Sequence, residues 1–132
     1  MTAEREGQLA TWRRLLDEAE QLLGRGEVDA ALQRIATARL RATAPPGEDA
    51  SEFAVALGEL GLRLKRGGDY DQAERCYADS IAILRQSGLD EARFLAVVLN
   101  NLAELDRTRG RYAPAEALYE EALRLWRTLG PE

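Results

Sequence analysis

Apolar residues recur every three or four positions along most of this chain, and short polar or glycine-containing stretches interrupt them. This period is typical of amphipathic helices that bury one face. The clearest stretch has apolar side chains at Leu95, Val98, Leu99, Leu102 and Leu105. Gly110 interrupts the pattern, because glycine adopts a positive φ at a helix C-terminus without a steric penalty. A second stripe follows at Ala115, Leu118, Tyr119, Ala122 and Trp126. The pattern therefore predicts a helical hairpin, with Pro114 in the first turn of its second helix.

The same reasoning predicts six antiparallel helices and no strand. The expected ranges are 3–24, 27–43, 50–66, 70–86, 90–109 and 112–128. In the second hairpin, Gly67 and Gly68 end one helix, and Asp69 is placed to cap the next. Gln72 follows three residues later, as in a capping box. We therefore expect an all-α fold.

The chain also repeats itself three times with an offset of 42 residues. The matching columns are Leu15/Leu57/Leu99, Ala19/Gly61/Ala103, Gly26/Gly68/Gly110, Val28/Tyr70/Tyr112, Ala31/Ala73/Ala115 and Ile35/Tyr77/Tyr119. A fixed period of this length is typical of a solenoid, in which each unit buries its apolar face against its neighbours. The columns predict equivalent packed sites for Tyr70 and Tyr112, and for Tyr77 and Tyr119.

The spacing Leu-x3-Gly/Ala-x6-Gly-x-Tyr-x2-Ala-x3-Tyr-x2-Ala/Ser resembles the tetratricopeptide repeat. The 42-residue period and the stretch Val98–Leu105 resemble its longer, kinesin-light-chain-like variety. The resemblance implies a right-handed α-solenoid of three helix-turn-helix hairpins. It places the units at about 12–45, 54–87 and 96–129, within a single domain that spans 1–132. Asp106 departs from the apolar Leu22 and Leu64 of its column, so we expect it to be exposed, hydrogen-bonded or paired.

Composition narrows the possible partners and source. The chain has 132 residues, 45% of them hydrophobic, and a net charge of −5, which favours one small domain and disfavours a general nucleic-acid or anionic-membrane surface. Lys65 is the only lysine among 18 basic residues, a bias that indicates a GC-rich bacterial source. No apolar run is long enough for a signal peptide or a membrane span, so we expect a cytoplasmic protein.

Catalytic chemistry has little support in the sequence. The chain contains no histidine, which excludes a histidine general base or metal ligand, and its single cysteine, Cys76, is interpreted as an inert thiol. No phosphate-binding Gly-x4-Gly-Lys-Ser/Thr loop is present, and the serines have no adjacent base. The carboxylate pairs Asp17/Glu20 and Glu120/Glu121 are interpreted as solvated helix surface. We predict no catalytic residue, no metal site and no cofactor.

The family resemblance implies a non-catalytic protein–protein interaction module that binds a peptide or partner protein in its concave groove. The residues at the groove columns are Arg13, Asp17, Glu20, Val55, Glu59, Leu62, Lys65, Val97, Asn100, Asn101, Glu104 and Arg107. Asn101 matches a column where the family often has an asparagine that bonds a bound backbone, since an amide both donates and accepts. The Lys/Asn pattern of chaperone-binding carboxylate clamps is absent, and the alternative is that these are ordinary surface side chains.

Self-association is the competing interpretation. A solenoid needs its last apolar face covered, and no polar helix follows the final stripe. The expected strip consists of Leu123, Leu125, Trp126 and Leu129. It predicts a homodimer through the last helix, or an oligomerisation or adaptor segment of a larger bacterial signalling or regulatory protein. The bland alternative is that Trp126 packs within its own unit, and a soluble enzyme is the least favoured class.

Overall fold

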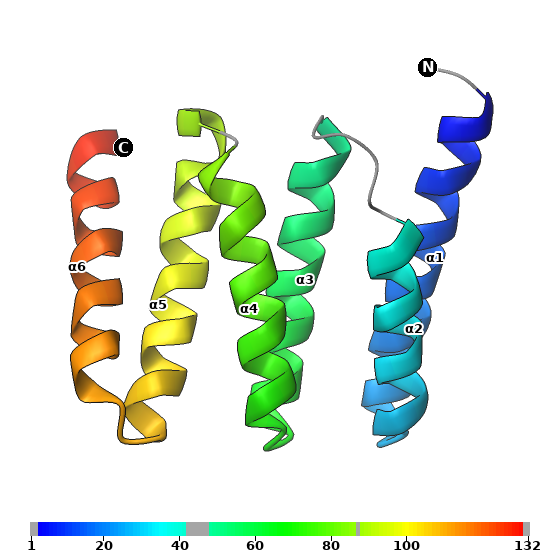
Figure 1. Cartoon of the computed structure of the whole chain (residues 1–132), viewed down its shortest axis with the longest axis horizontal. Coiled ribbons are helices and arrows are strands. Elements are labelled where there is room, and N and C mark those ends of the chain that lie inside the picture. The colour runs from blue at the N-terminus through cyan, green and yellow to red at the C-terminus, as the bar shows by residue number, and fades with distance from the viewer. Residues whose placement is uncertain (1–2, 42–47, 87, 131–132) are drawn as a thin grey trace. The chain divides into compact units, whose positions relative to one another are not determined.

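The computed structural model describes residues 3–41, 48–86 and 88–130. These ranges contain six α-helices, one short 3-10 helix and no strand (Figure 1). The helices are α1 (Ala3–Gly24), α2 (Val28–Arg41), α3 (Glu48–Arg66), α4 (Tyr70–Arg85), α5 (Ala92–Thr108) and α6 (Tyr112–Leu129). The predicted all-α hairpin architecture is confirmed. Residues 42 and 43 of the second expected helix lie outside the described ranges, and the expected start of α5 is instead the separate 3-10 helix η1 (Gly88–Glu91).

The chain divides into two compact units, Met1–Phe53 and Ala54–Glu132, and the boundary falls within α3. In the first unit, α1 packs on α2 around Trp12, Leu16, Ala19, Ala31 and Ile35. The Trp12 and Phe53 rings meet edge to face, with 5.2 Å between their centroids. The smaller Val28 and Ile35 therefore replace tyrosines in a hairpin that still has its own apolar core.

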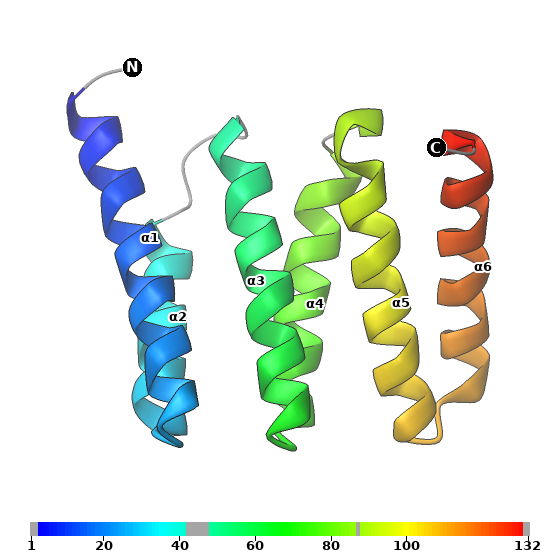
Figure 2. The same ribbon diagram turned by 180° about the vertical axis from the view of Figure 1, so that it is seen from behind.

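The second unit contains the C-terminal part of α3, followed by α4, α5 and α6. Helix α5 packs against both α4 and α6. From the opposite side, Figure 2 shows the C-terminal part of α3 and α5 in front of α4. The core of this unit includes Leu57, Leu64, Tyr77, Leu84, Leu99 and Leu105, all buried. Helix α4 is therefore in contact with both α3 and α5.

Small residues allow α3 and α4 to approach closely. A Cβ atom placed on Gly61 would lie 2.7 Å from Cε1 of Tyr77, a distance that real Cβ atoms do not adopt. One turn earlier, a Cβ atom on Gly58 would lie 3.2 Å from Cγ2 of Val98 in α5. The buried Ser80 hydroxyl donates a hydrogen bond of 2.6 Å to the carbonyl oxygen of Ala54. Glycine and serine in α3 and α4 are therefore packing residues.

The turns follow the predicted glycine pattern. Gly68 and Gly110 have φ values of 86° and 78°, in the region that favours glycine. Asp69 caps α4, because its Oδ1 atom accepts a hydrogen bond of 3.3 Å from the backbone N–H of Gln72. The predicted cap of α4 is confirmed.

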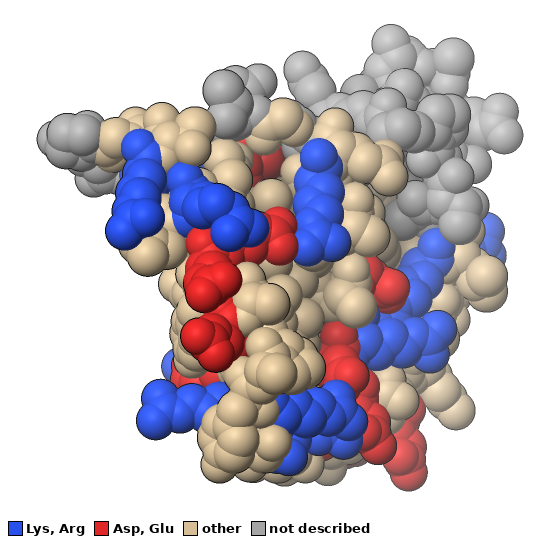
Figure 3. Space-filling view, turned by 60° about the vertical axis from the view of Figure 1, so that its left-hand side comes forward, with Lys and Arg blue, Asp and Glu red and all other residues tan. Residues whose placement is uncertain are grey.

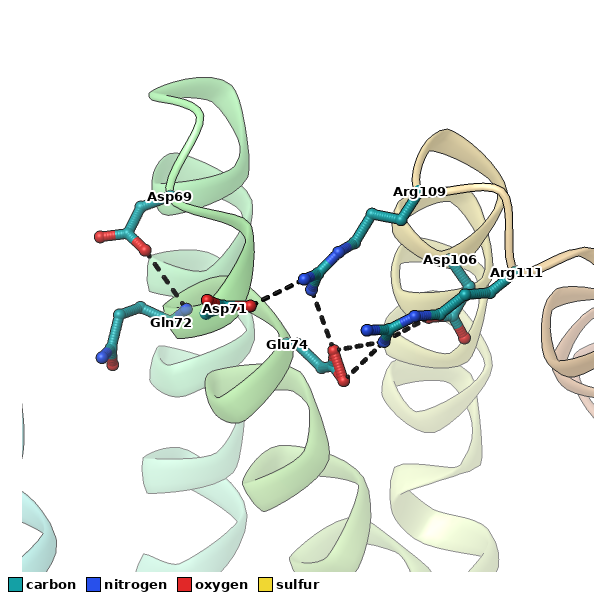
Figure 4. A network of polar contacts seen from close by, with 7 residues as sticks. All are labelled: Asp69, Asp71, Gln72, Glu74, Asp106, Arg109 and Arg111. Carbon is teal, nitrogen blue, oxygen red and sulfur yellow. Dashed lines mark hydrogen bonds and ion pairs between the residues drawn. The ribbon is translucent and has the colours of Figure 1, made fainter.

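A polar network joins the turn between α5 and α6 to the start of α4 (Figure 4). Arg109 donates to Asp71 at 2.7 Å and to Glu74 at 3.1 Å, and Arg111 donates to Glu74 at 2.8 Å. Asp106 is buried beside this network, with its carboxylate 3.8 Å from Arg111. Burial raises the pKa of Asp106 above its usual range and Glu74 adds to the rise, while Arg111 and Arg109 oppose it. Asp106 is therefore paired, which is one of the three alternatives that the sequence left open.

The expectation of equivalent tyrosine sites is wrong. Tyr77 is 0% exposed, whereas Tyr119 is 36% exposed and Tyr112 is 68% exposed. The physical reason is the neighbouring helix: α5 packs against α4, but no helix of the described chain covers the outward side of α6. The Tyr77 hydroxyl has no hydrogen-bond partner among the described residues, and burial raises its pKa to about 12.

Candidate partner-binding surfaces

Helix α5 presents a mixed apolar and polar face to solvent. Phe94 and Val97 are 48% and 45% exposed, although both are large apolar residues. Asn101 and Glu104 follow at helical spacing, so the four side chains form one stripe. We call the α5 face the set Phe94, Val97, Asn100, Asn101, Glu104 and Arg107. Its apolar end and its amide and charged end can contact different parts of one partner.

The C-terminal part of α3 borders this face. Lys65 Nζ lies 2.9 Å from Glu104 Oε1, which links α3 to α5. The Lys65 side chain is largely buried while that of Glu104 is mostly exposed, so Lys65 acts mainly as a brace between the helices. Glu59 is exposed on α3. The predicted groove residues of the second unit therefore include one pair that is already engaged.

The predicted groove residues of the first unit have their own surroundings. Arg13 forms an ion pair with Glu52, and its guanidinium carbon lies 5.4 Å from the centroid of the Trp12 ring. Asp17 and Glu20 are exposed on α1. Their role in binding a partner stays a prediction.

Phe94 was missed by the sequence reasoning. It lies outside the core columns of the repeat, and the equivalent residue one repeat earlier is the exposed Glu52. An aromatic residue at a position where the preceding unit carries an exposed charge was the available signal.

A second apolar surface lies on the outward side of α6. We call the α6 face the set Tyr112, Glu116, Tyr119, Leu123 and Arg127. The three apolar members are exposed, and beside them is a hollow of about 380 Å³ lined by α6 residues and Arg107 of α5. Of the residues predicted for self-association, Leu123 is exposed, while Leu125, Trp126 and Leu129 are half-buried. The sequence therefore predicted the helix but not the two tyrosines.

Charges along α6 are separated by sign. Exposed Glu116 and Glu120 lie in its N-terminal half, and exposed Arg124 and Arg127 in its C-terminal half. Figure 3 shows acidic side chains grouped along the middle of this side of the molecule, with basic side chains above and below them. The two ends of the exposed side of α6 therefore differ in charge, acidic toward the N-terminus and basic toward the C-terminus.

The described residues offer little catalytic chemistry. No cluster of His, Cys, Asp or Glu in these ranges could hold a metal ion, and no helix in them could span a membrane. Cys76 is buried, and the Ser80 hydroxyl is occupied by its bond to the Ala54 carbonyl.

Comparison with known families agrees with this architecture. The family model described as Tetratricopeptide repeat matches residues 52–128, more than half of the chain. No match to a curated protein sequence is found.

Proposed function

Because the chain belongs to the tetratricopeptide repeat family, we propose that it is a non-catalytic module that binds a peptide or partner protein through the α5 face. Repeats of this family generally mediate protein–protein interaction. The observation that carries the proposal is the exposure of Phe94 and Val97 beside Asn101. Within the same unit the proposed groove extends to Glu59 and Lys65. For the first unit, Arg13, Asp17 and Glu20 are proposed separately as partner-binding residues.

Each part of the α5 face has a role in this proposal. Phe94 and Val97 supply apolar area, and burying a side chain of this size contributes about 1.5–3 kcal/mol. Asn101 can donate to and accept from a partner backbone. Glu104 and Arg107 bear opposite charges, which favours a partner of mixed charge over a nucleic acid.

The test is affinity capture from the source cell, followed by binding measurements with the purified partner. The variant Phe94→Ser/Val97→Ser removes the apolar end, and substitution of Asn100, Asn101, Glu104 and Arg107 removes the polar end. Each should weaken binding at least about tenfold, or about 1.4 kcal/mol. Arg75→Gln, an exposed change on α4, is the matched control. Binding that survives both variants would place the site elsewhere, and tight, salt-sensitive DNA binding would overturn the proposal.

A second candidate function is self-association through α6, in a cytoplasmic adaptor segment of a larger bacterial regulatory protein. The exposure of Tyr112, Tyr119 and Leu123 on one side of the helix supports it. Sedimentation of the wild type and of Leu123→Glu or Trp126→Glu at matched concentration tests it. We expect the wild type to dimerise and each substitution to dissociate the dimer. A wild type that stays monomeric would contradict this function.

A further inference from the structure

The α6 face carries opposite charges at its two ends. Glu116 and Arg127 are both exposed and 11 residues apart, close to three full helical turns, so they lie on the same side of the helix. Tyr119 and Leu123 lie between them along the helix, on the same side. No described residue lies within ion-pair distance of Glu116 or Arg127. Such a stripe is complementary to itself when reversed.

We propose that α6 binds a second copy of α6 in antiparallel orientation about a two-fold axis, so that Glu116 of each copy pairs with Arg127 of the other. The inference rests on the second candidate function, self-association through α6, and adds its register. The axis passes between Glu121 and Ala122, the midpoint of the two charges. Tyr119 and Leu123 of both copies pack around it.

The covered side of the same unit shows what an arginine at this repeat position does. Arg85 of α4 precedes Arg127 by one 42-residue repeat, and its Nη2 atom lies 2.8 Å from Oε1 of Glu121 on α6. An arginine in this column therefore reaches a carboxylate on a neighbouring helix. Arg127 has the same place on α6, and the carboxylate that the two-fold axis brings to it is Glu116 of the second copy.

Charge complementarity favours a second copy over other occupants. One antiparallel contact forms two Glu116–Arg127 ion pairs, because an isologous interface uses the same patch on each subunit. A parallel contact would place like charges together, which is unfavourable. The antiparallel register also brings the C-terminal half of the second α6, including its half-buried Trp126, to the hollow beside the N-terminal half. Apolar contact supplies most of the affinity, while the exposed ion pairs set the orientation.

Charge exchange tests the register. Glu116→Arg and Arg127→Glu should each weaken the wild-type dimer at least about tenfold in sedimentation, and an equimolar mixture of the two variants should restore it. In that mixture each copy again meets an opposite charge at both ends. The double variant Glu116→Arg/Arg127→Glu should dimerise like the wild type. Arg75→Glu, the same charge change on α4, is the matched control and should leave the dimer unchanged.

The remaining outcomes separate this proposal from the function beneath it. A dimer that Leu123→Glu dissociates, but that both single charge variants leave intact, keeps self-association and overturns the antiparallel register. A mixture that stays as weak as its components also overturns the register. A wild type that remains monomeric up to about 100 μM overturns both the antiparallel register and self-association through α6. The same conclusion holds if a different helical partner is found to bind the α6 face.

Discussion

Two helices at the same position of the repeat, α4 and α6, have different surroundings. Tyr77 of α4 lies between the backbone of Gly61 and the rest of the core and is 0% exposed. Tyr119, one 42-residue repeat later, is 36% exposed. The two residues have the same chemistry and the same place in their hairpins. The repeat column therefore specifies which side of the helix a side chain occupies, while the next helix specifies whether it is buried.

The charges on the two hairpins that contain these helices, α3–α4 and α5–α6, differ in the same way. On the covered side, Lys65 pairs with Glu104 and Arg85 pairs with Glu121. Their equivalents one repeat later, Arg107 and Arg127, have no ion-pair partner among the described residues. The last hairpin thus has basic residues without a described ion-pair partner at positions where those of the middle hairpin are paired.

The largest expected difference is in stability. Tyr77→Ala should lower the unfolding free energy by about 3–5 kcal/mol, because it empties a buried site. Tyr119→Ala should lower it by about 1–2 kcal/mol, because its ring already contacts water. Urea unfolding of both variants in dilute solution checks the contrast. Equal losses would mean that α6 is as well covered as α4.

The close approach of α3 and α4 gives the next effect. Gly61→Ala should cost about 1–3 kcal/mol, because the added Cβ meets the Tyr77 ring at 2.7 Å. Gly24→Ala at the end of α1 is the matched control, since no atom lies within 4 Å of a Cβ placed there. The control should be neutral, or more stable by up to about 1 kcal/mol, from helix propensity alone. Thermal unfolding of the two variants distinguishes the clash from a general effect of alanine.

Alkaline pH should act through Tyr77. Its pKa is about 12 in the folded protein and 10.0 in an ordinary environment, so the unfolded chain loses this proton first as the pH rises. The contribution of Tyr77 to stability is therefore constant below pH 10 and falls between pH 10 and 12. At pH 11 the loss is about 1.4 kcal/mol. Urea unfolding at pH 9 and pH 11 should show this extra loss in the wild type and not in Tyr77→Phe. An equal loss in both proteins would assign the effect to other groups.

The smallest difference concerns the two arginines. Arg85→Ala should lower stability by about 0.5–1 kcal/mol, because it removes a partly exposed ion pair. Arg127→Ala should leave the stability of the dilute protein unchanged, because Arg127 has no described partner to lose. Differential scanning calorimetry of the two variants compares their stabilities directly. If only Arg127→Ala lowered stability, the assignment of Arg85 to the covered side and Arg127 to the uncovered side would be wrong.

The helices and turns could be predicted from the sequence because their causes are local. Gly68, Gly110 and the Asp69 cap act within a few residues of their own positions. The exposure of Tyr119 could not be predicted, because it depends on which helix packs against α6. Phe94 was missed for a related reason: the repeat columns identify core positions and say nothing of an apolar residue outside them. Whether the predicted groove residues act together stays a prediction.

The ion pairs around Arg109 also affect how readily a protease that cleaves after arginine can cut the folded chain. The Arg109 side chain is 21% exposed and bound to Asp71 and Glu74, so the loop before α6 is fastened to a neighbouring helix. In the equivalent turn of the first hairpin, Arg25 is 65% exposed and lies 3.8 Å from its nearest carboxylate, Glu27. A cleavage site must leave its neighbours and extend before it fits an active site. The first turn can do this at little cost, whereas the third must first give up its bonds to α4.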